Sequence, residues 1–405
     1  MRNLWVAVLV AVLLSMAAAA HADATTDALK STVESLQRQL TDALQRIKAL
    51  EAAQTTAPAQ PAAQPTPAPA AKPSWTDKLL ISAYAQFRYE ARDDMVGRFP
   101  NGPYVGWPPA GSGADATDEF LIRRLYLNFI AKPNPRTNVV LALRRLGGDG
   151  GTIDLEGAFV DYALDKTYHV EFGRVYNKFG WDTWESSSKR LVFDRFAAGE
   201  GYANAGLRGL YANGPTDNGI YISRKSCGEW EPNIYVGLVN GNFISAENNS
   251  DKAFSVDLKW DHKDWHWGAS WMDGDYTESY TNPLPPPAGA VGTFDRRMLG
   301  LYLRKDPAPW GVQAEYVDGR LYGYDVNGWY TQGSYLVGSK GTAYVRYEEY
   351  EPTDTPAVPG DLFHAWRIGY ARQVDKNNEI TLEYMPARRG SFDVGQFGVQ
   401  WQAGF

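Results

Sequence analysis

The sequence is poor in cysteine and in long apolar runs, and both shortages restrict what it can form. The 405 residues include a single cysteine, Cys227, which excludes a disulfide framework and a zinc site built from several cysteines. After residue 20, no run approaches the roughly 18 apolar residues that a membrane-spanning helix needs. We therefore expect the mature chain to be either soluble or a membrane β-barrel, whose strands give a much weaker hydropathy signal.

Positive charge and histidine are scarce as well. The formal net charge is -7, which argues against nucleic acid as a partner, because binding it needs a basic face. The chain has 5 histidines, and the pair His262 and His266 flanks a turn without a third group to complete a catalytic set. The sequence therefore predicts no catalytic residue, no metal ligand and no cofactor, and the chain is not expected to be an enzyme.

Residues 1–22 have the features of a secretory signal peptide. Arg2 gives a basic start, an apolar run extends from residue 4 to residue 16, and Ala20-His21-Ala22 forms a small-x-small cleavage site. An uncleaved membrane anchor is the alternative, but the run is short and ends in alanines. The mature protein is predicted to begin at Asp23, outside the cytoplasm.

Residues 23–54 predict a periplasmic coiled-coil helix. Apolar residues recur there at alternating steps of four and three, as in a heptad seam. A lone amphipathic helix is the alternative, and the seam does not decide between two and three strands. Residues 55–74 are rich in proline and alanine and predict an extended spacer. The seam consists of Leu29, Val33, Leu36, Leu40, Ala43, Ile47 and Leu50.

Residues 75–405 change to a period of two and contain all of the Tyr and Phe and all but one of the Trp. For example, Phe254, Val256, Leu258 and Trp260 alternate with polar residues. About sixteen such runs can be counted, separated by turns that alternate between short and long. A soluble β-sandwich or propeller would also have many amphipathic strands. Aromatic residues near the strand ends and a final alternating strand that closes on Phe405 favour a transmembrane antiparallel β-barrel.

Several motifs along residues 79–405 resemble the phosphate-selective porins O and P of Gram-negative outer membranes. Each motif is short, and it is their order and spacing that is typical of the family. Asn177 departs from the pattern, because the family tends to have proline there. The motifs include Phe120-Leu121-Ile122-Arg123-Arg124-Leu125-Tyr126-Leu127, Glu156-Gly157-Ala158-Phe159-Val160-Asp161-Tyr162, Phe172-Gly173-Arg174-Val175-Tyr176-Asn177-Lys178-Phe179-Gly180, Phe193-Asp194-Arg195, Gly206-Leu207-Arg208-Gly209 and Gly328-Trp329-Tyr330-Thr331-Gln332-Gly333.

The resemblance implies a trimeric, sixteen-stranded outer-membrane channel whose N-terminal stem lies in the periplasm. It also implies that the segment around 181–205 folds into the pore and narrows it. Outer-membrane lipid, two further copies of the chain and small anionic solutes are then the expected partners, and the stem could contact the cell wall. In such a channel, rings of charged side chains at the constriction set the ion selectivity.

Five basic residues are the candidates for lining the pore and binding anions. Arg124 and Arg144 alternate with outward apolar residues, Arg208 alternates with Leu207 and Gly209, and Arg195 belongs to the predicted constriction. Lys178 lies in a motif just before it. Arginine suits oxyanions because its guanidinium stays charged and offers paired donors. The alternative is that these residues have no selective role, or are neutralised by carboxylates such as Asp161 and Asp194.

The acidic composition of the barrel conflicts with simple anion selectivity. Glu90, Asp161, Asp257 and Asp261 also alternate onto the predicted lumen face. Net charge does not fix the electrostatic field at one constriction, so phosphate passage stays the first hypothesis. A saccharide channel, or a non-selective or cation-preferring porin that also tethers the outer membrane through its stem, is the alternative.

Overall fold

The structure is a computed structural model, and it describes the barrel part of the chain. The chain divides into two units, Met1–Lys72 and Pro73–Phe405. The described residues all belong to the second unit, so the predicted signal peptide, the coiled-coil helix and the whole spacer lie outside them. Described are residues 78–92, 117–146, 153–183, 185–202, 207–208, 216–241, 250–279, 291–321, 324–352, 362–390 and 392–405.

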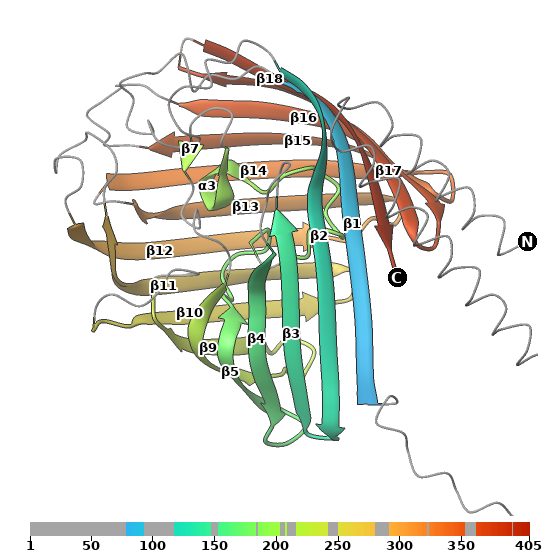
Figure 1. Cartoon of the computed structure of the whole chain (residues 1–405). Coiled ribbons are helices and arrows are strands. Elements are labelled where there is room, and N and C mark those ends of the chain that lie inside the picture. Colours follow the sequence, from blue (N-terminus) through green and yellow to red (C-terminus); the bar gives the residue numbers. More distant parts are fainter. Residues whose placement is uncertain are drawn as a thin grey trace, which may run out of the picture. The chain divides into compact units, whose positions relative to one another are not determined.

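The described strands form a closed antiparallel barrel (Figure 1). Its order around the ring is β1-β18-β17-β16-β15-β14-β13-β12-β11-β10-β9-β8-β5-β4-β3-β2. These sixteen strands confirm the predicted all-β antiparallel barrel, whereas the coiled-coil helix and linker predicted before it lie outside the described residues. Among the described residues, no helix is both long and apolar enough to cross a membrane.

The first seven strands of the ring in chain order lie between residues 79 and 239. They are β1 (Leu79–Arg92), β2 (Thr117–Asn134), β3 (Thr137–Leu146), β4 (Asp154–Ala163), β5 (Tyr168–Tyr176), β8 (Thr216–Arg224) and β9 (Asn233–Val239). The remaining nine are β10 (Ala253–His262), β11 (Trp265–Ser279), β12 (Val291–Lys305), β13 (Trp310–Leu321), β14 (Tyr324–Val337), β15 (Gly341–Pro352), β16 (Phe363–Asp375), β17 (Asn378–Arg389) and β18 (Phe392–Gly404).

The barrel closes between its first and last strands. Phe87 of β1 is opposite Trp401 of β18 in the antiparallel register. The backbone N–H of Phe405 donates to the carbonyl of Ala83 at 3.0 Å, and Ala83 returns a bond to the carbonyl of Phe405 at 3.2 Å. The alternating strand predicted at the end of the chain is therefore the strand that closes the ring.

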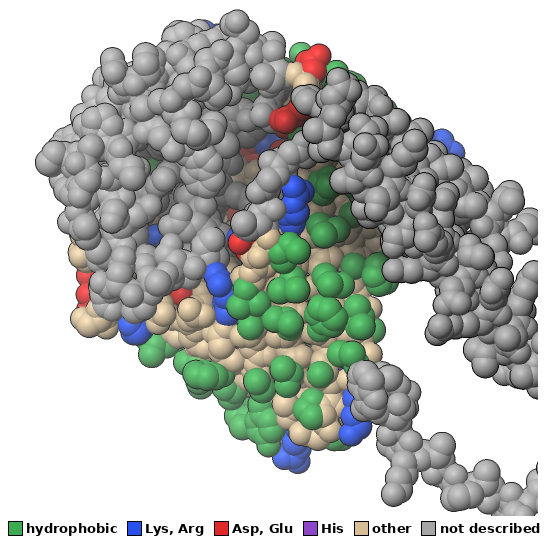
Figure 2. Space-filling model, viewed as in Figure 1, with side chains coloured by type: hydrophobic (Ala, Val, Ile, Leu, Met, Phe, Trp, Pro, Cys, Tyr) green, Lys and Arg blue, Asp and Glu red, His purple; other side chains and the backbone are tan. Residues whose placement is uncertain are grey.

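The two faces of each strand differ as the period of two predicts. On β2, Leu125 points outward and is 41% exposed, whereas Arg124 points inward and is 1% exposed. Figure 2 shows apolar side chains gathered over the outer surface in the region of β1 to β5. Outward apolar residues next to inward polar ones are what a barrel surrounded by lipid requires.

The interior is partly filled by the connection between β5 and β8. Residues 177–200 of this connection, here called the lumen segment, end in the short helix α3 (Ala197–Glu200). The helix packs against β14 and β15 inside the ring (Figure 1). Phe179 and Phe196 of the lumen segment join a buried core with wall residues such as Tyr330. The chain then forms a two-stranded ribbon, β6 (Gly201–Tyr202) with β7 (Leu207–Arg208), which is separate from the barrel sheet.

Candidate functional site

Carboxylates on the barrel wall hold the backbone of the lumen segment. Glu315 of β13 accepts hydrogen bonds from the backbone N–H groups of Trp181, at 3.1 Å, and Asp182, at 3.0 Å. Glu383 of β17 accepts one from the N–H of Phe193 at 3.1 Å. Buried backbone N–H groups need acceptors of this kind. These bonds fix the lumen segment at two places on the barrel wall.

The first and last strands of the ring, β1 and β18, hold the lumen segment through amides. The side-chain amide of Gln86 on β1 donates to the carbonyl of Ser187 at 3.2 Å. The amide of Gln402 on β18 donates to the carbonyl of Ser188 at 3.0 Å. The lumen segment therefore contacts β1 and β18 as well as β13 and β17, which places it along the inner wall of this part of the ring.

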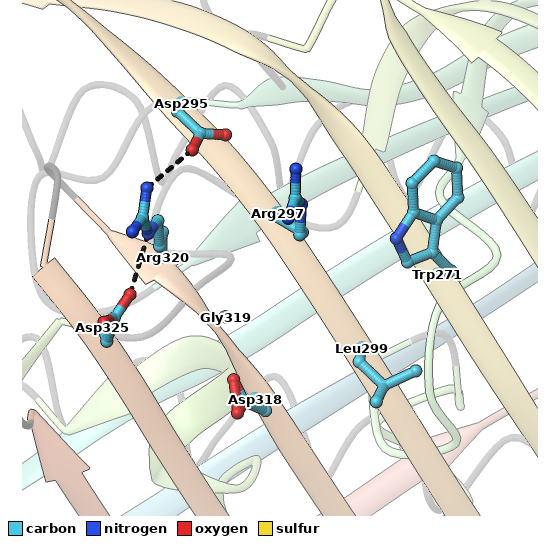
Figure 3. Close-up of a pocket in the computed structure, with 8 residues that line it drawn as sticks. All are labelled: Trp271, Asp295, Arg297, Leu299, Asp318, Gly319, Arg320 and Asp325. Carbon is cyan, nitrogen blue, oxygen red and sulfur yellow. Dashed lines mark hydrogen bonds and ion pairs between the residues drawn. The ribbon is translucent and has the colours of Figure 1, made fainter.

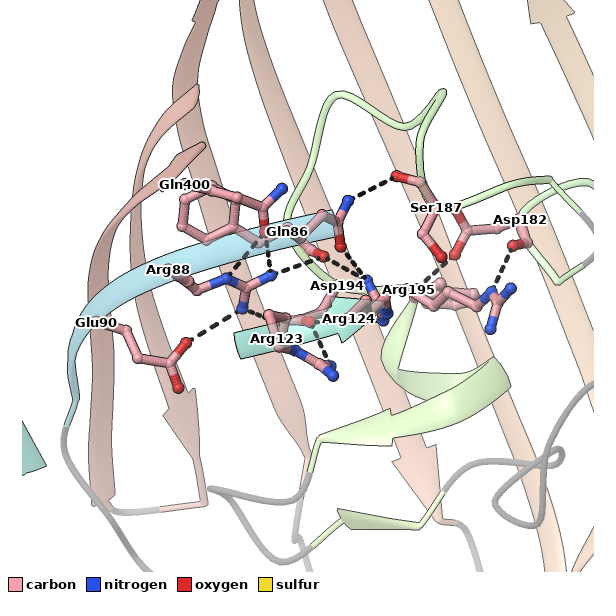
Figure 4. Close-up of polar contacts among 12 residues, drawn as sticks. Gln86, Arg88, Glu90, Arg123, Arg124, Asp182, Ser187, Asp194, Arg195 and Gln400 are labelled. Carbon is pink, nitrogen blue, oxygen red and sulfur yellow. Dashed lines mark hydrogen bonds and ion pairs between the residues drawn. The ribbon is translucent and has the colours of Figure 1, made fainter. Parts of the chain in front are cut away.

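Three arginines converge on Asp194 of the lumen segment (Figure 4). The carboxylate lies 3.2 Å from Nη1 of Arg88, 2.8 Å from Nη2 of Arg123 and 3.9 Å from Nη2 of Arg124. Arg88 also pairs with Glu90 at 3.1 Å. We call these five residues the Asp194 cluster. Burial by itself would raise the pKa of Asp194, but Arg88, Arg123 and Arg124 hold it well below its usual range.

Asp182 organises the other end of the lumen segment. Its carboxylate accepts from the backbone N–H of Phe196 at 2.6 Å and lies 3.5 Å from Nη2 of Arg346 on β15. Burial would raise the pKa of Asp182, but the charges of Arg346 and then Arg190 outweigh it and lower the pKa. Asp182 is therefore an ionised, buried anchor and not a proton carrier near neutral pH.

The indole of Trp181 contacts two cations of the barrel wall, one on β10 and one on β12. Nζ of Lys259 is 4.8 Å and the guanidinium carbon of Arg304 is 4.9 Å from the ring centroid. Arg304 also forms an ion pair with Glu185. Burial raises the pKa of Glu185 even though Arg304 opposes the shift. Glu185 is therefore the carboxylate of the lumen segment that takes up a proton more easily than an ordinary glutamate.

Two of the five predicted pore residues belong to the contact between the lumen segment and its surroundings. Arg124 donates to the carbonyl of Phe193 at 3.3 Å, and Arg195 donates through Nε to the carbonyl of Asp182 at 3.1 Å. Arg124 and Arg195 are both buried. Their guanidinium groups are thus already engaged by the protein.

Two more of the predicted residues lie on or next to the β3–β5 part of the wall, each beside a carboxylate. Nη1 of Arg144 is 2.5 Å from Glu156, and Nζ of Lys178 is 3.3 Å from Glu171. Arg144 is opposite Tyr126 in the β2–β3 register, so it is a diagonal neighbour of Arg124. The alternative interpretation, in which carboxylates neutralise the predicted arginines, is therefore correct in part. Asp194 is a partner of Arg124, as expected, whereas Arg144 pairs with Glu156 and not with Asp161.

Arg208 does not lie on a barrel strand. It belongs to β7, where it is opposite Gly201 of β6, and its side chain is outside the described part of the structure. The expectation that alternation along a wall strand turns Arg208 into the lumen is therefore not supported, because the local sheet is the separate ribbon.

The predicted acidic lumen residues do face inward. Asp257 is fully buried and accepts from the hydroxyl of Ser270 at 2.6 Å. Asp161 lies 2.9 Å from Nδ1 of His169, and Asp261 lies 2.5 Å from Nδ1 of His266. Each of these carboxylates therefore has a polar or basic neighbour within the wall.

Sequence reasoning missed several of the most buried arginines. Arg88, Arg346 and Arg367 are each at most 2% exposed. Arg367 bridges two carboxylates, Glu348 at 3.0 Å and Glu383 at 3.1 Å. The alternation of Phe87, Arg88 and Tyr89, or of Val345, Arg346 and Tyr347, would have placed them on the lumen face by the rule that was applied to Arg124.

Comparison with known proteins identifies a protein family that matches part of the chain and solved structures that share its fold. Residues 108–277 match the family model described as phosphate-selective porin O and P. No curated protein has a sequence that matches this chain significantly.

Solved structures of outer-membrane porins share the barrel. The anion-selective porin from Comamonas acidovorans has 13% identity and a TM-score of 0.54, and the match covers 81% of this chain and 99% of that one. The channel DcaP of Acinetobacter baumannii has 11% identity and a TM-score of 0.56, with 81% and 97% covered. OmpT of Vibrio cholerae in its trimer form has 10% identity and a TM-score of 0.55, with 81% and 100% covered.

Identities this low establish the fold alone, so the assignment depends on the family match together with the closed barrel. Residues 108–277 match the phosphate-selective porin O and P family, as the motifs predicted, and the closed sixteen-stranded barrel has the fold of the outer-membrane porins.

Proposed function

We propose that this porin is a diffusion channel for small hydrophilic solutes with a modest preference for anions, phosphate among them. The lumen segment, continued towards residue 205, is its constriction. The observation that carries the proposal is the Asp194 cluster. There, three guanidinium groups from β1 and β2 surround the carboxylate of Asp194, and Glu90 pairs with Arg88.

The Asp194 cluster can dominate selectivity although the chain is acidic as a whole. The Debye length at physiological salt is about 8 Å, so exposed acidic groups at the mouth are screened from a constriction deeper in the barrel. Charges beside the narrowest section act on each permeating ion at short range. The excess of positive charge in the cluster therefore favours anions where passage is most restricted.

Reversal potentials in a salt gradient test this proposal. Arg123 is the cluster arginine with most exposure, 23% for its side chain, so Arg123→Gln removes positive charge without opening a fully buried site. We expect this variant to move the reversal potential towards cation preference, and the shift to shrink as salt rises. A wild-type channel that prefers cations at low salt would refute the anion preference.

A matched control lies on the outer wall. Arg297 of β12 is 67% exposed at its side chain and lines a surface hollow with Trp271, Leu299 and the ion pair of Arg320 with Asp295 (Figure 3). Arg297→Gln removes the same charge outside the lumen. It should leave the reversal potential unchanged.

Cation preference is the second candidate, and the acidic wall residues favour it. The carboxylate groups of Asp161 and Asp261 remain partly exposed, at 20% and 38% of their side chains. If their field exceeds that of the Asp194 cluster, the wild-type channel will prefer cations. Replacing both residues by asparagine would then abolish that preference.

Assembly as a homotrimer through the predicted coiled-coil stem is part of the proposal. The heptad seam of residues 23–54 needs partner helices to cover its apolar positions. Because the described strands begin at Leu79, deletion of residues 23–73 should leave a folded barrel. Detergent-solubilised protein that is monomeric at all concentrations would refute the trimer.

A further inference from the structure

A pocket of about 460 Å³ lies at the end of the barrel where β1 begins and β18 ends. Five neighbouring strands, β2, β1, β18, β17 and β16, form its wall, and Ser186 and Ser188 of the lumen segment form another side. The short turn between β16 and β17 also lines it. Because short turns of outer-membrane barrels face the periplasm, this is the periplasmic end of the lumen.

Amides and hydroxyls predominate in the lining of this periplasmic pocket. Among the described residues that line it, Lys376 and Glu379 are the only charged side chains, and their charges cancel. The pocket therefore has no excess charge with which to select an ion. Its neutral polar side chains, apart from the two serines of the lumen segment, are Ser82, Asn128, Gln373, Asn377, Asn378 and Gln402.

Several of these polar groups are available to a ligand. Gln402 is engaged, because its amide donates to the carbonyl of Ser188 at 3.0 Å. Each unengaged amide offers a donating NH₂ group and an accepting carbonyl oxygen, and a serine hydroxyl can do both. The side chains that form no hydrogen bond with another group of the described protein are Ser82, Asn128, Gln373 and Asn377.

An aromatic ring lies beside these polar groups. Tyr84 of β1 stacks on Tyr126 of β2, with ring centroids 4.8 Å apart and an interplanar angle of 14°. On its other side, Tyr84 is opposite Gly404 of β18, which has no side chain to cover the ring. Tyr84 and Gly404 both line the pocket. One flank of the tyrosine is therefore open to a ligand.

We propose that the periplasmic pocket binds a neutral sugar in its pyranose form. Sugar hydroxyls both donate and accept hydrogen bonds, and the unengaged amides can do the same in return. The C–H face of a pyranose ring is apolar and would be removed from water against Tyr84. The volume lies within the roughly 300 to 1,000 Å³ of small-molecule sites, which combine such a surface with a few polar groups.

The inference does not depend on the proposed anion preference. Among the described residues that line the pocket, none belongs to the Asp194 cluster. The two sites also differ in chemistry, because guanidinium groups surround Asp194 whereas neutral amides surround the pocket. A channel could therefore have either site without the other.

Single-channel conductance of the full-length protein in planar bilayers tests the proposal, with glucose as the probe. A sugar held in the pocket obstructs the periplasmic end of the lumen, so conductance should fall with glucose concentration and then reach a plateau. Glycerol, adjusted to the same bulk conductivity, has no ring to stack on Tyr84. It should show only the gradual decrease that the solution itself causes.

Two substitutions remove single unengaged amides. Asn128→Ala and Gln373→Ala should each raise the half-saturating glucose concentration by about three- to tenfold, as expected for the loss of one neutral hydrogen bond. Asn327 provides a matched control. It alternates with the buried residue Val326 on β14 and so faces outward, and Asn327→Ala should respond to glucose as the wild type does.

A third substitution tests the aromatic part of the pocket. Gly404→Leu keeps every polar side chain and fills the space beside Tyr84, so it should abolish the saturable response to glucose. If this variant does not insert into membranes, Asn128→Ala and Gln373→Ala still decide the question.

Two results would overturn the proposal. One is a wild-type response to glucose that coincides with the response to glycerol, and the other is a half-saturating concentration that is unchanged in both alanine variants. The reversal potential, measured without sugar, separates this outcome from the proposed function. A glucose response in a cation-preferring channel would refute only the proposed anion preference, and an anion-preferring channel without that response would refute only the sugar site.

Discussion

Arg123 and Arg124 are consecutive in the sequence, and yet both reach the carboxylate of Asp194, at 2.8 Å and 3.9 Å. Neighbouring residues of a regular strand point to opposite faces. Here the β1–β2 register shifts, so that Gln86 is opposite Arg124 while Phe87 is opposite Ile122. Arg123 is the extra residue of a β-bulge, and the bulge turns a second arginine towards the lumen segment.

Removal of the Asp194 charge should act in two ways. Asp194→Asn leaves three buried or half-buried guanidinium groups facing a neutral side chain, so the reversal potential should move towards anion preference. The barrel should also lose about 3 kcal/mol of stability, as expected when one partner of a buried ion pair is removed. The selectivity shift is opposite in sign to that of Arg123→Gln, and equal signs in the two variants would contradict this account of the Asp194 cluster.

Gly180 should be essential for seating the lumen segment. Its φ is +64°, and a side chain there would overlap the carboxylate of Glu315, which binds the next two backbone N–H groups. Gly180→Ala should therefore displace the segment, which would alter the single-channel conductance and lower the temperature of unfolding. Gly338 has φ +66° with open space around it, so Gly338→Ala carries the same backbone cost, about 1 kcal/mol, without the overlap. Conductance should change in the first variant only.

The raised pKa of Glu185 predicts a pH-dependent selectivity. As pH falls from 7 towards about 4.5, Glu185 takes up a proton before an ordinary glutamate does, whereas Asp194 and Asp182, with lowered pKa values, stay ionised. Anion preference should therefore increase over this range. The pKa of Glu185 is higher in the folded than in the unfolded protein. Ionised Glu185 therefore lowers the free energy of unfolding at pH values above its pKa in the folded protein, and this penalty is lost as the pH falls below that pKa.

Glu185→Gln provides the control for that titration. Its anion preference should already be high at pH 7, and it should vary less with pH than that of the wild type. The charges that face Glu185 are Arg304, Arg190 and Asp182, and the variant leaves all three in place. An identical pH response in wild type and variant would assign the effect to another carboxylate.

The side chain of Phe405 should matter more for insertion of the barrel into the membrane than for the stability of the inserted barrel. Phe405 is 76% exposed, and its backbone exchanges hydrogen bonds with Ala83 at the closing seam. Phe405→Asp places a charge on the outer face at the end of β18, so membrane insertion in cells should fall strongly. Phe405→Tyr keeps the aromatic ring and should insert normally. If the aspartate variant inserts as well as the wild type, the terminal aromatic is not an assembly signal.

The alternation of apolar and polar residues was enough to predict which side chains of the barrel wall face the lumen. It placed Arg124 and Arg144 inside and Leu125 outside, because side-chain direction on a strand depends only on the position in the register. It gives no account of Arg123, since a bulge is a property of two strands together. It also cannot show that Arg208 belongs to a ribbon outside the barrel sheet, since a short ribbon is indistinguishable from a wall strand over two residues.

The partners of the inward charges could not be predicted for a different reason. Arg88 contacts Asp194, which is 106 residues away in the sequence, and Arg346 contacts Asp182, which is still further away in the sequence. Such pairs depend on the route that the lumen segment takes through the barrel. This route is set by carboxylates on β13 and β17, and no local pattern in residues 177–200 reveals it.

The seam between β1 and β18 has a consequence for biogenesis. Gln86 and Gln402 meet there, 316 residues apart, so one edge of β1 has no partner until the last strand has been delivered. An open sheet edge is not tolerated in hydrocarbon. If the strands entered lipid one by one, the backbone N–H and C=O groups at the free edge of β1 would have no hydrogen-bond partners. We therefore expect another protein to shield this edge until β1 and β18 pair.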